Sequence, residues 1–305
     1  MKKIAVVILN FNGKNDTIEC LKSLESLSKK DFKLEILVVD NGSDEKFETK
    51  NPELKTGELK IIRSEKNLGF AGGNNIGIKH AVENGADYIL ILNNDTIADQ
   101  NLLQGLLNVL EKDKTIGIVG PKIYFAEGFE FHKKRYKKTE LGKVIWYAGG
   151  IMDWKNITGC HRGVDEVDSG QYEEEAETGF VSGCCMLIRR EVFEKIGFFD
   201  EKYFLYYEDS DFNQKARNSG YKIIYSPKAI LWHKNAGSAG GSGSILQDYY
   251  ITRNRLLFGL RYAPLRSKLS LIKESFKLAI KGRPWQKRGV IDFYLGRLGK
   301  GSYSI

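Results

Sequence analysis

The chain has 305 residues, of which 42% are hydrophobic and 28% charged, and this balance excludes a disordered or fibrous protein. Its formal net charge is +8, but the basic residues gather near the C-terminus, where residues 253–300 hold 13 Lys and Arg against 2 acidic residues. The rest of the chain has 34 basic and 37 acidic residues and is slightly acidic. The net charge therefore does not indicate nucleic-acid binding, which would need a basic surface on the body of the protein.

Short strand-like runs alternate with helical patterns through the first third of the chain. Buried strands of a parallel sheet are expected to be apolar and rich in β-branched residues. Runs of this kind are Ile4–Leu9, Leu34–Val39, Leu59–Ile62, Tyr88–Leu92 and Ile116–Val119. Between them, apolar residues recur at spacings of three and four over 18–27 and 102–110, which predicts amphipathic helices. The alternation predicts an open α/β sheet with right-handed crossovers.

The second half of the chain departs from this alternation. Residues 127–177 are polar and predict a surface insertion, and strand character returns at 181–188 and 222–225. The Gly/Ser-rich residues 236–244 are typical of a flexible segment, which fits either a lid over a bound ligand or a passive linker. From residue 248 onward, apolar residues interleave with basic ones, which predicts a helical, basic and amphipathic extension.

The cysteines and the apolar runs indicate the cellular compartment of the protein. Cys20, Cys160, Cys184 and Cys185 form no C-x-x-C pair, which predicts reduced thiols rather than a disulfide framework or a zinc site. The apolar run at residues 4–9 is too short for a signal peptide. No stretch of about 18 apolar residues is present that could cross a bilayer. The sequence therefore predicts a cytoplasmic protein.

Candidate binding residues follow the strands, because open α/β sheets bind ligands at the carboxyl ends of their strands. Asn10 and Phe11 follow the first strand in place of a G-x-G-x-x-G motif, which counts against a dinucleotide-dependent dehydrogenase. Asp40 ends the second strand. Its carboxylate could accept an N–H from the edge of uracil or thymine, or it could cap the next element. Either role fits the turn residues that follow it.

Two further turns hold candidate phosphate and metal ligands. A glycine-rich turn, residues 67–75, leads into a helix over residues 76–82, and the unpaired N–H groups of a helix start can bind an anion. A tight turn with Asn74 as the helix cap would give the same pattern. After the fourth strand, Asn94 and Asp95 could hold Mg²⁺ or Mn²⁺ against substrate phosphates, although an Asx turn has the same residues.

The densest group of acids is Glu208, Asp209 and Asp211, directly behind the aromatic run 204–207. Acids in the first turn of a helix are favoured by its dipole, but three of them repel one another and need a compensating partner. At about 100° per residue, Glu208 and Asp211 share a face and Asp209 points elsewhere, so only one or two enter a common cleft. His233 ends another strand-like run and is a candidate ligand for an ion such as Mn²⁺.

Taken together, these motifs resemble the family 2 glycosyltransferases, particularly their rhamnosyltransferase-like branch, over residues 3–260. The matching segments are residues 7–12, 38–43, 67–74, 92–96, 183–190, 197–201 and 207–212, and His233. The resemblance implies a GT-A fold, which is a Rossmann-like, mostly parallel sheet with flanking helices, in residues 1–247. Its nucleotide-binding part would span about 1–97 and its acceptor part about 98–247, followed by the helical extension 248–305.

The resemblance also implies an activity: inverting, metal-dependent transfer of a sugar from a dTDP- or UDP-sugar, with dTDP-rhamnose suggested by the branch. The acceptor would be a hydroxyl of a glycan or lipid-linked glycan in cell-surface polysaccharide synthesis. Asp209 matches the catalytic base, and Asp95 with His233 would hold Mn²⁺ or Mg²⁺. The positions that match the donor nucleotide site are Asn10, Phe11, Asp40, Asn67, Gly69, Gly73, Asn74 and Asn94. Those that match the donor-sugar and acceptor site are Gly183, Cys184, Tyr207 and Glu208.

Two departures from the family pattern leave alternatives open. The metal motif reads Asn93-Asn94-Asp95 instead of carrying two acids, which predicts weaker metal binding and allows a catalytically inactive sugar-nucleotide-binding relative. Gly183 and Cys184 stand where the family more usually has Gly-Ala, so the resemblance does not define the donor-sugar pocket. A nucleotidyltransferase would need a basic, glycine-rich loop after the first strand, and Asn10–Gly13 is a poor substitute.

The basic extension predicts a partner of its own. Amphipathic basic helices bind anionic membrane surfaces, which would place the protein at the cytoplasmic face of a membrane as a peripheral protein. A helix pair packed on the body, or a homodimer contact, would show the same pattern. The predicted partners are thus a nucleotide-sugar donor, a glycan acceptor and an anionic membrane, without nucleic acid.

Overall fold

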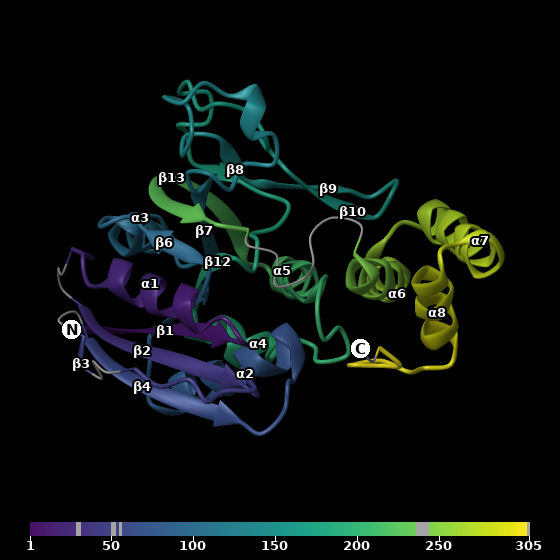
Figure 1. Ribbon diagram of the computed structural model, residues 1–305, viewed down its shortest axis with the longest axis horizontal. Helices are drawn as coiled ribbons and strands as arrows, with labels where there is room; N and C mark the ends of the chain where they lie inside the picture. The colour runs from purple at the N-terminus through teal and green to yellow at the C-terminus, as the bar shows by residue number, and fades with distance from the viewer. Residues whose placement is uncertain (29–31, 50–52, 55–56, 236–243, 304–305) are drawn as a thin grey trace.

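A computed structural model of the chain describes residues 1–28, 32–49, 53–54, 57–235 and 244–303. Within these residues, a central eleven-stranded sheet is flanked by helices, and a cluster of three helices lies at the C-terminal side (Figure 1). The main path of the sheet follows the order β11-β13-β7-β12-β5-β1-β2-β4-β3. The predicted mixed α/β architecture with a helical extension is confirmed.

The first half of the sheet is parallel, as the apolar runs predict. Its strands are β1 (Lys2–Asn10), β2 (Phe32–Asn41), β4 (Gly57–Ser64) and β5 (Tyr88–Asn93), with β3 (Glu53–Leu54) antiparallel at the edge. Helices α1 (Lys14–Leu24) and α2 (Gly69–Glu83) follow β1 and β4. In register, Asn10 lies opposite Asp40, and Leu9 lies opposite Asn93. The carboxyl ends of β1, β2 and β5 therefore meet at one edge of the sheet.

The second half of the sheet is mixed in direction. Its strands are β6 (Thr96–Ala98), β7 (Ile116–Phe125), β8 (Ile145–Tyr147), β11 (Ala176–Glu177), β12 (Cys185–Arg189) and β13 (Lys222–His233). β12 lies antiparallel between β5 and β7. β13 is longer than the predicted 222–225 because it continues, after a register shift between Ser226 and Ile230, to pair with β6. This continuation carries His233 to a position opposite Thr96.

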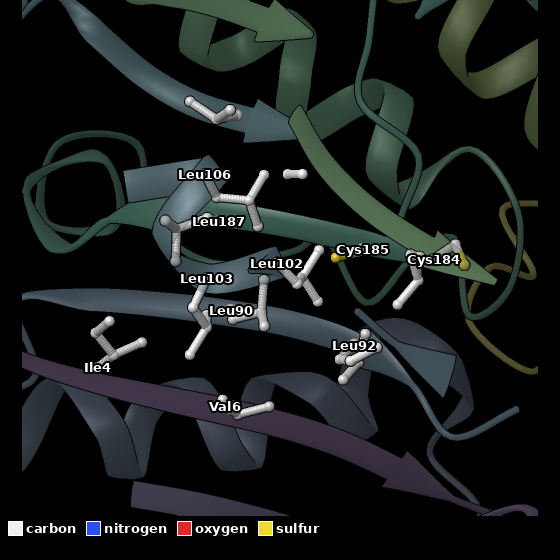
Figure 2. Packing of buried hydrophobic residues seen from close by; sticks show 14 of the residues in the cluster. Ile4, Val6, Leu90, Leu92, Leu102, Leu103, Leu106, Cys184, Cys185 and Leu187 are labelled. Atoms are coloured by element: carbon white, nitrogen blue, oxygen red, sulfur yellow. The ribbon is translucent and has the colours of Figure 1, made fainter. Parts of the chain in front are cut away.

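The core lies on both faces of the sheet, because alternate residues of each buried strand point to opposite sides. On one face, Ile4 and Val6 of β1 and Leu90 and Leu92 of β5 pack beneath α3 (Leu102–Leu110), whose leucines point onto the strands (Figure 2). On the other face, α2, α4 (Arg190–Ile196) and α5 (Glu208–Asn218) cover the sheet.

The segment 127–177 is only partly the surface insertion that its polarity predicts. It contains a short 3-10 helix (Lys133–Arg135) and the hairpin of β9 (Gly150–Asp153) and β10 (Thr158–His161). However, β8 pairs with β7 in the main sheet, and Tyr147 is fully buried. The prediction was wrong here because the apolar run at 144–148 is short and surrounded by charged residues.

The C-terminal helices are α6 (Ile245–Tyr262), α7 (Leu265–Lys281) and α8 (Pro284–Tyr294). Ser244 caps α6 by accepting the Gln247 N–H, so a division of the chain at residue 247 would fall within the first turn of this helix. The proposed lid or linker, residues 236–243, lies outside the described residues. Among the helices that the structure describes, none is long and apolar enough to span a membrane.

Candidate active site

Asn10 organises the loop after β1. Its Oδ1 accepts hydrogen bonds from Gly13 N (3.2 Å) and Thr17 Oγ1 (3.0 Å), and its Nδ2 donates to Ser43 Oγ (3.1 Å). Asn94, after β5, donates from Nδ2 to the same Thr17 hydroxyl at 3.0 Å. The side chains that follow β1, β2 and β5 thus form one hydrogen-bonded group. Sequence reasoning had expected Asn10 and Asn94 in one site, and the structure brings them together through the start of α1.

Asp40 lies at the floor of this group and is 1% exposed. Burial would raise the pKa of its carboxyl, but hydrogen bonds from Ser43, from the Phe47 N–H and from Arg63 outweigh burial and lower that pKa. The carboxylate is therefore ionised and already bonded within the chain, with Arg63 as its ion-pair partner. Phe11, by contrast, follows Asn10 directly and is 40% exposed.

Helix α2 begins at Gly69, inside the glycine-rich turn predicted at 67–75, and its first two N–H groups are engaged by the chain itself. Gly69 N donates to Asn67 Oδ1 (2.8 Å), and Phe70 N donates to the carbonyl of Phe204 (2.7 Å). Gly69 has φ +73°, and a Cβ there would lie 2.3 Å from Phe204 O, so glycine is required for this contact. In this structure the turn receives the segment around Phe204 rather than presenting an open anion cradle.

Further along α2, Gly73 and Asn74 serve packing. A Cβ on Gly73 would lie 2.4 Å from Leu9 Cδ1, so its absence lets the helix approach β1. Asn74 is buried inside the helix, where its Nδ2 donates to Phe70 O and its Oδ1 has no hydrogen-bond partner. The helix cap is Leu68, so the alternative interpretation of Asn74 as the cap was wrong. Direct contact of this turn with a donor stays a prediction.

Asp95 and His233 are 138 residues apart in sequence but meet in the structure. His233 Nε2 lies 3.1 Å from Asp95 Oδ1, and the side chains are 6% and 15% exposed. Antiparallel pairing of β13 with β6 produces this contact, because it sets His233 opposite Thr96. His233 Nδ1 is buried without a hydrogen-bond partner.

One carboxylate oxygen and one imidazole nitrogen side by side fit a divalent ion such as Mn²⁺. Over the described part of the chain, no group of three or more His, Cys, Asp or Glu side chains could hold a metal. These two side chains would therefore be its protein ligands, and a bound diphosphate would have to supply others. The Asn-Asn-Asp motif had led us to expect such a sparse donor set.

Asp209 stands in the first turn of α5. Its Oδ2 accepts from Gly183 N (2.9 Å), and its Oδ1 accepts from Ser210 N (2.6 Å). Burial raises the pKa of this carboxyl above its ordinary value, against the hydrogen bonds from Gly183 and Ser210, which lower it. A Cβ on Gly183 would lie 3.1 Å from the Phe70 ring and 3.4 Å from Asp209 Cβ. The predicted residues Gly183 and Asp209 are thus direct neighbours.

The turn that carries Gly183 connects Asp209 to the strand end before Asp95. Cys184, the next residue, accepts at its carbonyl a hydrogen bond from Asn93 N (2.9 Å). Burial raises the pKa of the Cys184 thiol, and the charge of Asp95 adds to this effect. The Asp209 carboxylate and the end of the strand before Asp95 therefore both bond to the turn at Gly183 and Cys184.

Glu208 and Tyr207 lie beside Asp209. Glu208 is buried, its Oε2 has no hydrogen-bond partner, and burial, followed by the charge of Asp209, raises the pKa of this carboxyl well above its ordinary value. Tyr207 donates its hydroxyl to Ile157 O (2.9 Å) in the β9–β10 hairpin. Asp211, in contrast, turns away from the site toward Arg261 and Tyr262 of α6.

Sequence reasoning missed two aromatic residues near the pair formed by Asp95 and His233. The Trp146 ring packs edge-on against His233, with centroids 4.6 Å apart, and against His161 at 4.3 Å. His161 Nδ1 donates to Trp146 O (3.1 Å), and burial lowers the pKa of this imidazole to about 4, so it is neutral at pH 7. The apolar run around Trp146 was the only signal in the sequence that could have found them.

Comparison with known proteins shows the family of the chain. Residues 5–197 match the family model described as Glycosyl transferase family 2. The low-salt glycan biosynthesis hexosyltransferase Agl10 of Haloferax volcanii is 24% identical over 255 residues, which cover 83% of this chain and 74% of that protein. The N-acetylglucosaminyl-diphospho-decaprenol L-rhamnosyltransferase of Mycobacterium tuberculosis is 25% identical over 214 residues, which cover 67% of this chain and 68% of that protein.

Solved structures show the same fold at low sequence identity. GalNAc-T7 with UDP, GalNAc and Mn²⁺ aligns with a TM-score of 0.62 at 18% identity, over 91% of this chain and 55% of that chain. TarS of Staphylococcus aureus in complex with UDP aligns with a TM-score of 0.57 at 17% identity, over 96% of this chain and 79% of that chain. The expected GT-A fold is thereby confirmed. Because the family model matches more than half of the length of the chain, the chain belongs to glycosyl transferase family 2 and is a glycosyltransferase.

Proposed function

We propose that the protein transfers a sugar from a nucleoside diphosphate donor to an acceptor hydroxyl with inversion, and that Asp209 is the general base. The observation that carries this proposal is the shared turn: Gly183 N–H holds the Asp209 carboxylate, and Cys184 joins that turn to the strand end before Asp95. A base and a diphosphate site are thus held in one rigid unit, as a single displacement at the anomeric carbon requires.

The proposed step uses Asp209 to take the acceptor proton. The acceptor oxygen forms a bond to the anomeric carbon while the bond from that carbon to the diphosphate oxygen breaks, and the nucleoside diphosphate leaves with the electron pair. The acceptor proton moves to the Asp209 carboxylate. Burial, which raises the pKa of Asp209, supports this role because it makes the carboxylate a stronger base than an exposed aspartate.

We propose a dTDP- or UDP-sugar as donor, with dTDP-rhamnose as the first candidate. The exposed ring of Phe11 suits the stacking of a pyrimidine base, and the preceding residue, Asn10, lies opposite Asp40 in the sheet. The M. tuberculosis relative is named as a rhamnosyltransferase, and its name gives a lipid-linked sugar as acceptor. A glycan or lipid-linked glycan acceptor in surface polysaccharide synthesis follows for this chain by analogy.

Asp95 and His233 would hold Mn²⁺ or Mg²⁺ together with the donor diphosphate. Such an ion stabilises negative charge on a departing diphosphate. Two solved neighbours, GalNAc-T7 and the mannosyltransferase PcManGT, contain Mn²⁺ in their crystals, which supports the assignment.

Removal of the Asp95 carboxylate is expected to abolish metal-dependent nucleotide binding. Asp95→Ala leaves His233 as the single ligand of the proposed pair, so UDP and dTDP should bind no more tightly with Mn²⁺ than without it. Calorimetric titration of UDP and dTDP, each with Mn²⁺ or with EDTA, measures the difference. Asp99→Asn, four residues away at a carboxylate that only accepts a local Asn101 N–H, is the matched control. Unchanged Mn²⁺ dependence in Asp95→Ala would contradict the metal assignment.

We further propose that α7 rests on an anionic membrane surface at the cytoplasmic face. Leu265, Leu269, Phe276 and Ile280 are 58–73% exposed. At about 100° per residue these four positions fall within about 60° of the helix circumference and form one apolar stripe. Lys268 lies beside the stripe on one side and Lys273 on the other, as expected of a helix that lies on anionic lipid.

Charge in the stripe should remove membrane binding. The double variant Leu269→Glu/Phe276→Glu is expected to lose sedimentation with phosphatidylglycerol vesicles, which the unchanged protein should show and which phosphatidylcholine vesicles should not support. Ile61→Glu, at an exposed apolar residue of β4, is the control. The alternative homodimer contact predicts a change in molar mass by light scattering without a change in vesicle binding, and that result would contradict the membrane proposal.

A further inference from the structure

The residues just before α5 form a turn with an unusual backbone. Phe204, Tyr206 and Tyr207 have φ values of 64°, 67° and 72°, in the left-handed region that side-chain-bearing residues rarely adopt. Three such residues within four positions persist only where their surroundings hold them. Tyr207 is at the same time the N-cap of α5, so the turn sets the direction in which Glu208 and Asp209 leave it.

Helix α6 holds one side of this turn through two fully buried side chains. Asn254 Nδ2 lies 2.9 Å from Tyr203 O, 2.7 Å from Leu205 O and 2.8 Å from Tyr206 O. Arg253 donates from Nη2 to Tyr203 O at 2.9 Å, and from Nε to Asn254 Oδ1 at 3.0 Å. The bond to Oδ1 fixes the orientation of the amide, so that its N–H groups point to the carbonyls of the turn.

The other side of the turn reaches the body of the enzyme. The carbonyl of Phe204 accepts the N–H groups of Phe70 (2.7 Å) and Ala71 (3.3 Å) at the start of α2. The Phe70 ring in turn borders Gly183, whose N–H holds the Asp209 carboxylate. The turn is therefore a link between α6, α2 and Asp209.

We propose that Asn254 is a positioning residue for glycosyl transfer and that its amide, oriented by Arg253, keeps the turn 203–207 in the conformation that sets Asp209 against Gly183. The inference rests on the proposed role of Asp209 as base. Without the amide, three carbonyls lose a buried donor and the left-handed residues lose their restraint. The C-terminal extension is then part of the catalytic unit, in addition to any contact it makes with a membrane.

The test compares Asn254→Ala with Leu271→Ala in the full chain. Leu271 is a buried α7 residue that packs against Gly259 of α6, so its truncation loosens the same helical cluster but leaves the hydrogen bonds from Arg253 and Asn254 to the turn in place. Nucleoside diphosphate release from a panel of dTDP- and UDP-sugars gives kcat and KM. Hydrogen exchange at the Phe70 and Ala71 amides reports on the link itself, and thermal melting reports on stability.

Asn254→Ala is expected to lower kcat by about 10²-fold, as small displacements of a catalytic group do, with the donor KM unchanged and with faster exchange at Phe70 and Ala71. Leu271→Ala should lower the melting temperature but leave kcat and these two amides unchanged. If Asn254→Ala does not fold, Asn254→Ser, which keeps a donor at the position, takes its place. This variant is also expected to lower kcat and to speed exchange at Phe70 and Ala71.

Two results would overturn the inference: wild-type kcat and exchange in both Asn254 variants, or an equal loss of kcat in Leu271→Ala. An active Asp209→Asn enzyme would refute the base assignment itself. An inactive Asp209→Asn enzyme beside a fully active Asn254→Ala enzyme would refute only the positioning role.

Discussion

Asp209→Asn is expected to abolish sugar transfer while nucleotide binding survives. The amide has the shape of the carboxylate and can still accept the Gly183 N–H through its oxygen, which should keep the turn in position. Its nitrogen loses the Ser210 N–H but can donate to the Ser210 hydroxyl, which lies 3.2 Å from Oδ1 in the unchanged protein. The amide cannot take a proton from an acceptor hydroxyl. Loss of a general base costs about 10²–10⁴-fold in rate, and we expect kcat to fall by at least that factor with the Kd for UDP or dTDP unchanged.

The pH dependence of the unchanged enzyme provides an independent check on this role. A base acts when deprotonated, so kcat should rise with pH through the pKa of Asp209. Because burial raises that pKa, kcat should increase at a pH above the ordinary aspartate pKa of about 3.9. Asp153→Asn, at an exposed carboxylate of the β9–β10 hairpin, should retain full activity as the control. Transfer at the wild-type rate in Asp209→Asn would refute the assignment.

Much of the site was predictable because parallel strands end at a common edge. Asn10 and Asp40 lie at the carboxyl ends of β1 and β2, and Asn94 directly follows β5, so the pairing of these strands brings the three residues together. The contact between Asp95 and His233 could not be predicted in this way. This contact depends on the extension of β13 beyond a register shift and on the antiparallel pairing of β13 with β6. No local sequence pattern predicts either feature. Only the resemblance to a family had joined these two residues.

Other features were missed because the same residue types have two physical uses. Glycines before a helix permit anion binding, but at Gly69 the missing side chain admits the carbonyl of Phe204 instead. Arg253 belongs to a run that is basic in sequence and would be expected at the surface, yet it is fully buried, flanked by the rings of Tyr249 and Tyr250. Composition cannot distinguish such an arginine from an exposed one, because the partners come from distant segments.

The basic residues of the C-terminal extension therefore fall into two groups, one on α7 and one on α6, with different contacts. Lys268 and Lys273 of α7 flank an apolar stripe, and the proposed membrane contact rests on this arrangement. The buried or partly buried arginines of α6 bond to the body: Arg253 to the turn before α5, and Arg261 to Asp200 and Asp211. Loss of the whole extension is then expected to disturb the active site as well as membrane binding, so single side-chain variants are needed to separate the two effects.

The largest stability effect is expected at Asp211, whose fully buried carboxylate joins α5 to α6. Its Oδ1 accepts from Tyr203 Oη (3.0 Å), Arg261 Nη1 (2.9 Å) and Tyr262 Oη (2.9 Å), and Lys215 Nζ lies 2.7 Å from Oδ2. Asp211→Ala leaves two cations and two hydroxyls without this partner. Removal of one side of a buried ion pair costs about 3–5 kcal/mol, and we expect a loss of this size in the free energy of unfolding by urea.

Glu274→Ala provides the matched comparison, since Glu274 also pairs with an arginine of α6, Arg255, but is 43% exposed. An exposed ion pair contributes about 0–1 kcal/mol, so its loss should shift the urea midpoint little. Asp211→Asn, which keeps an oxygen for the tyrosine hydroxyls, should fall between the two. Equal midpoints for Asp211→Ala and Glu274→Ala would show that burial of the Asp211 network does not stabilise the contact between α5 and α6.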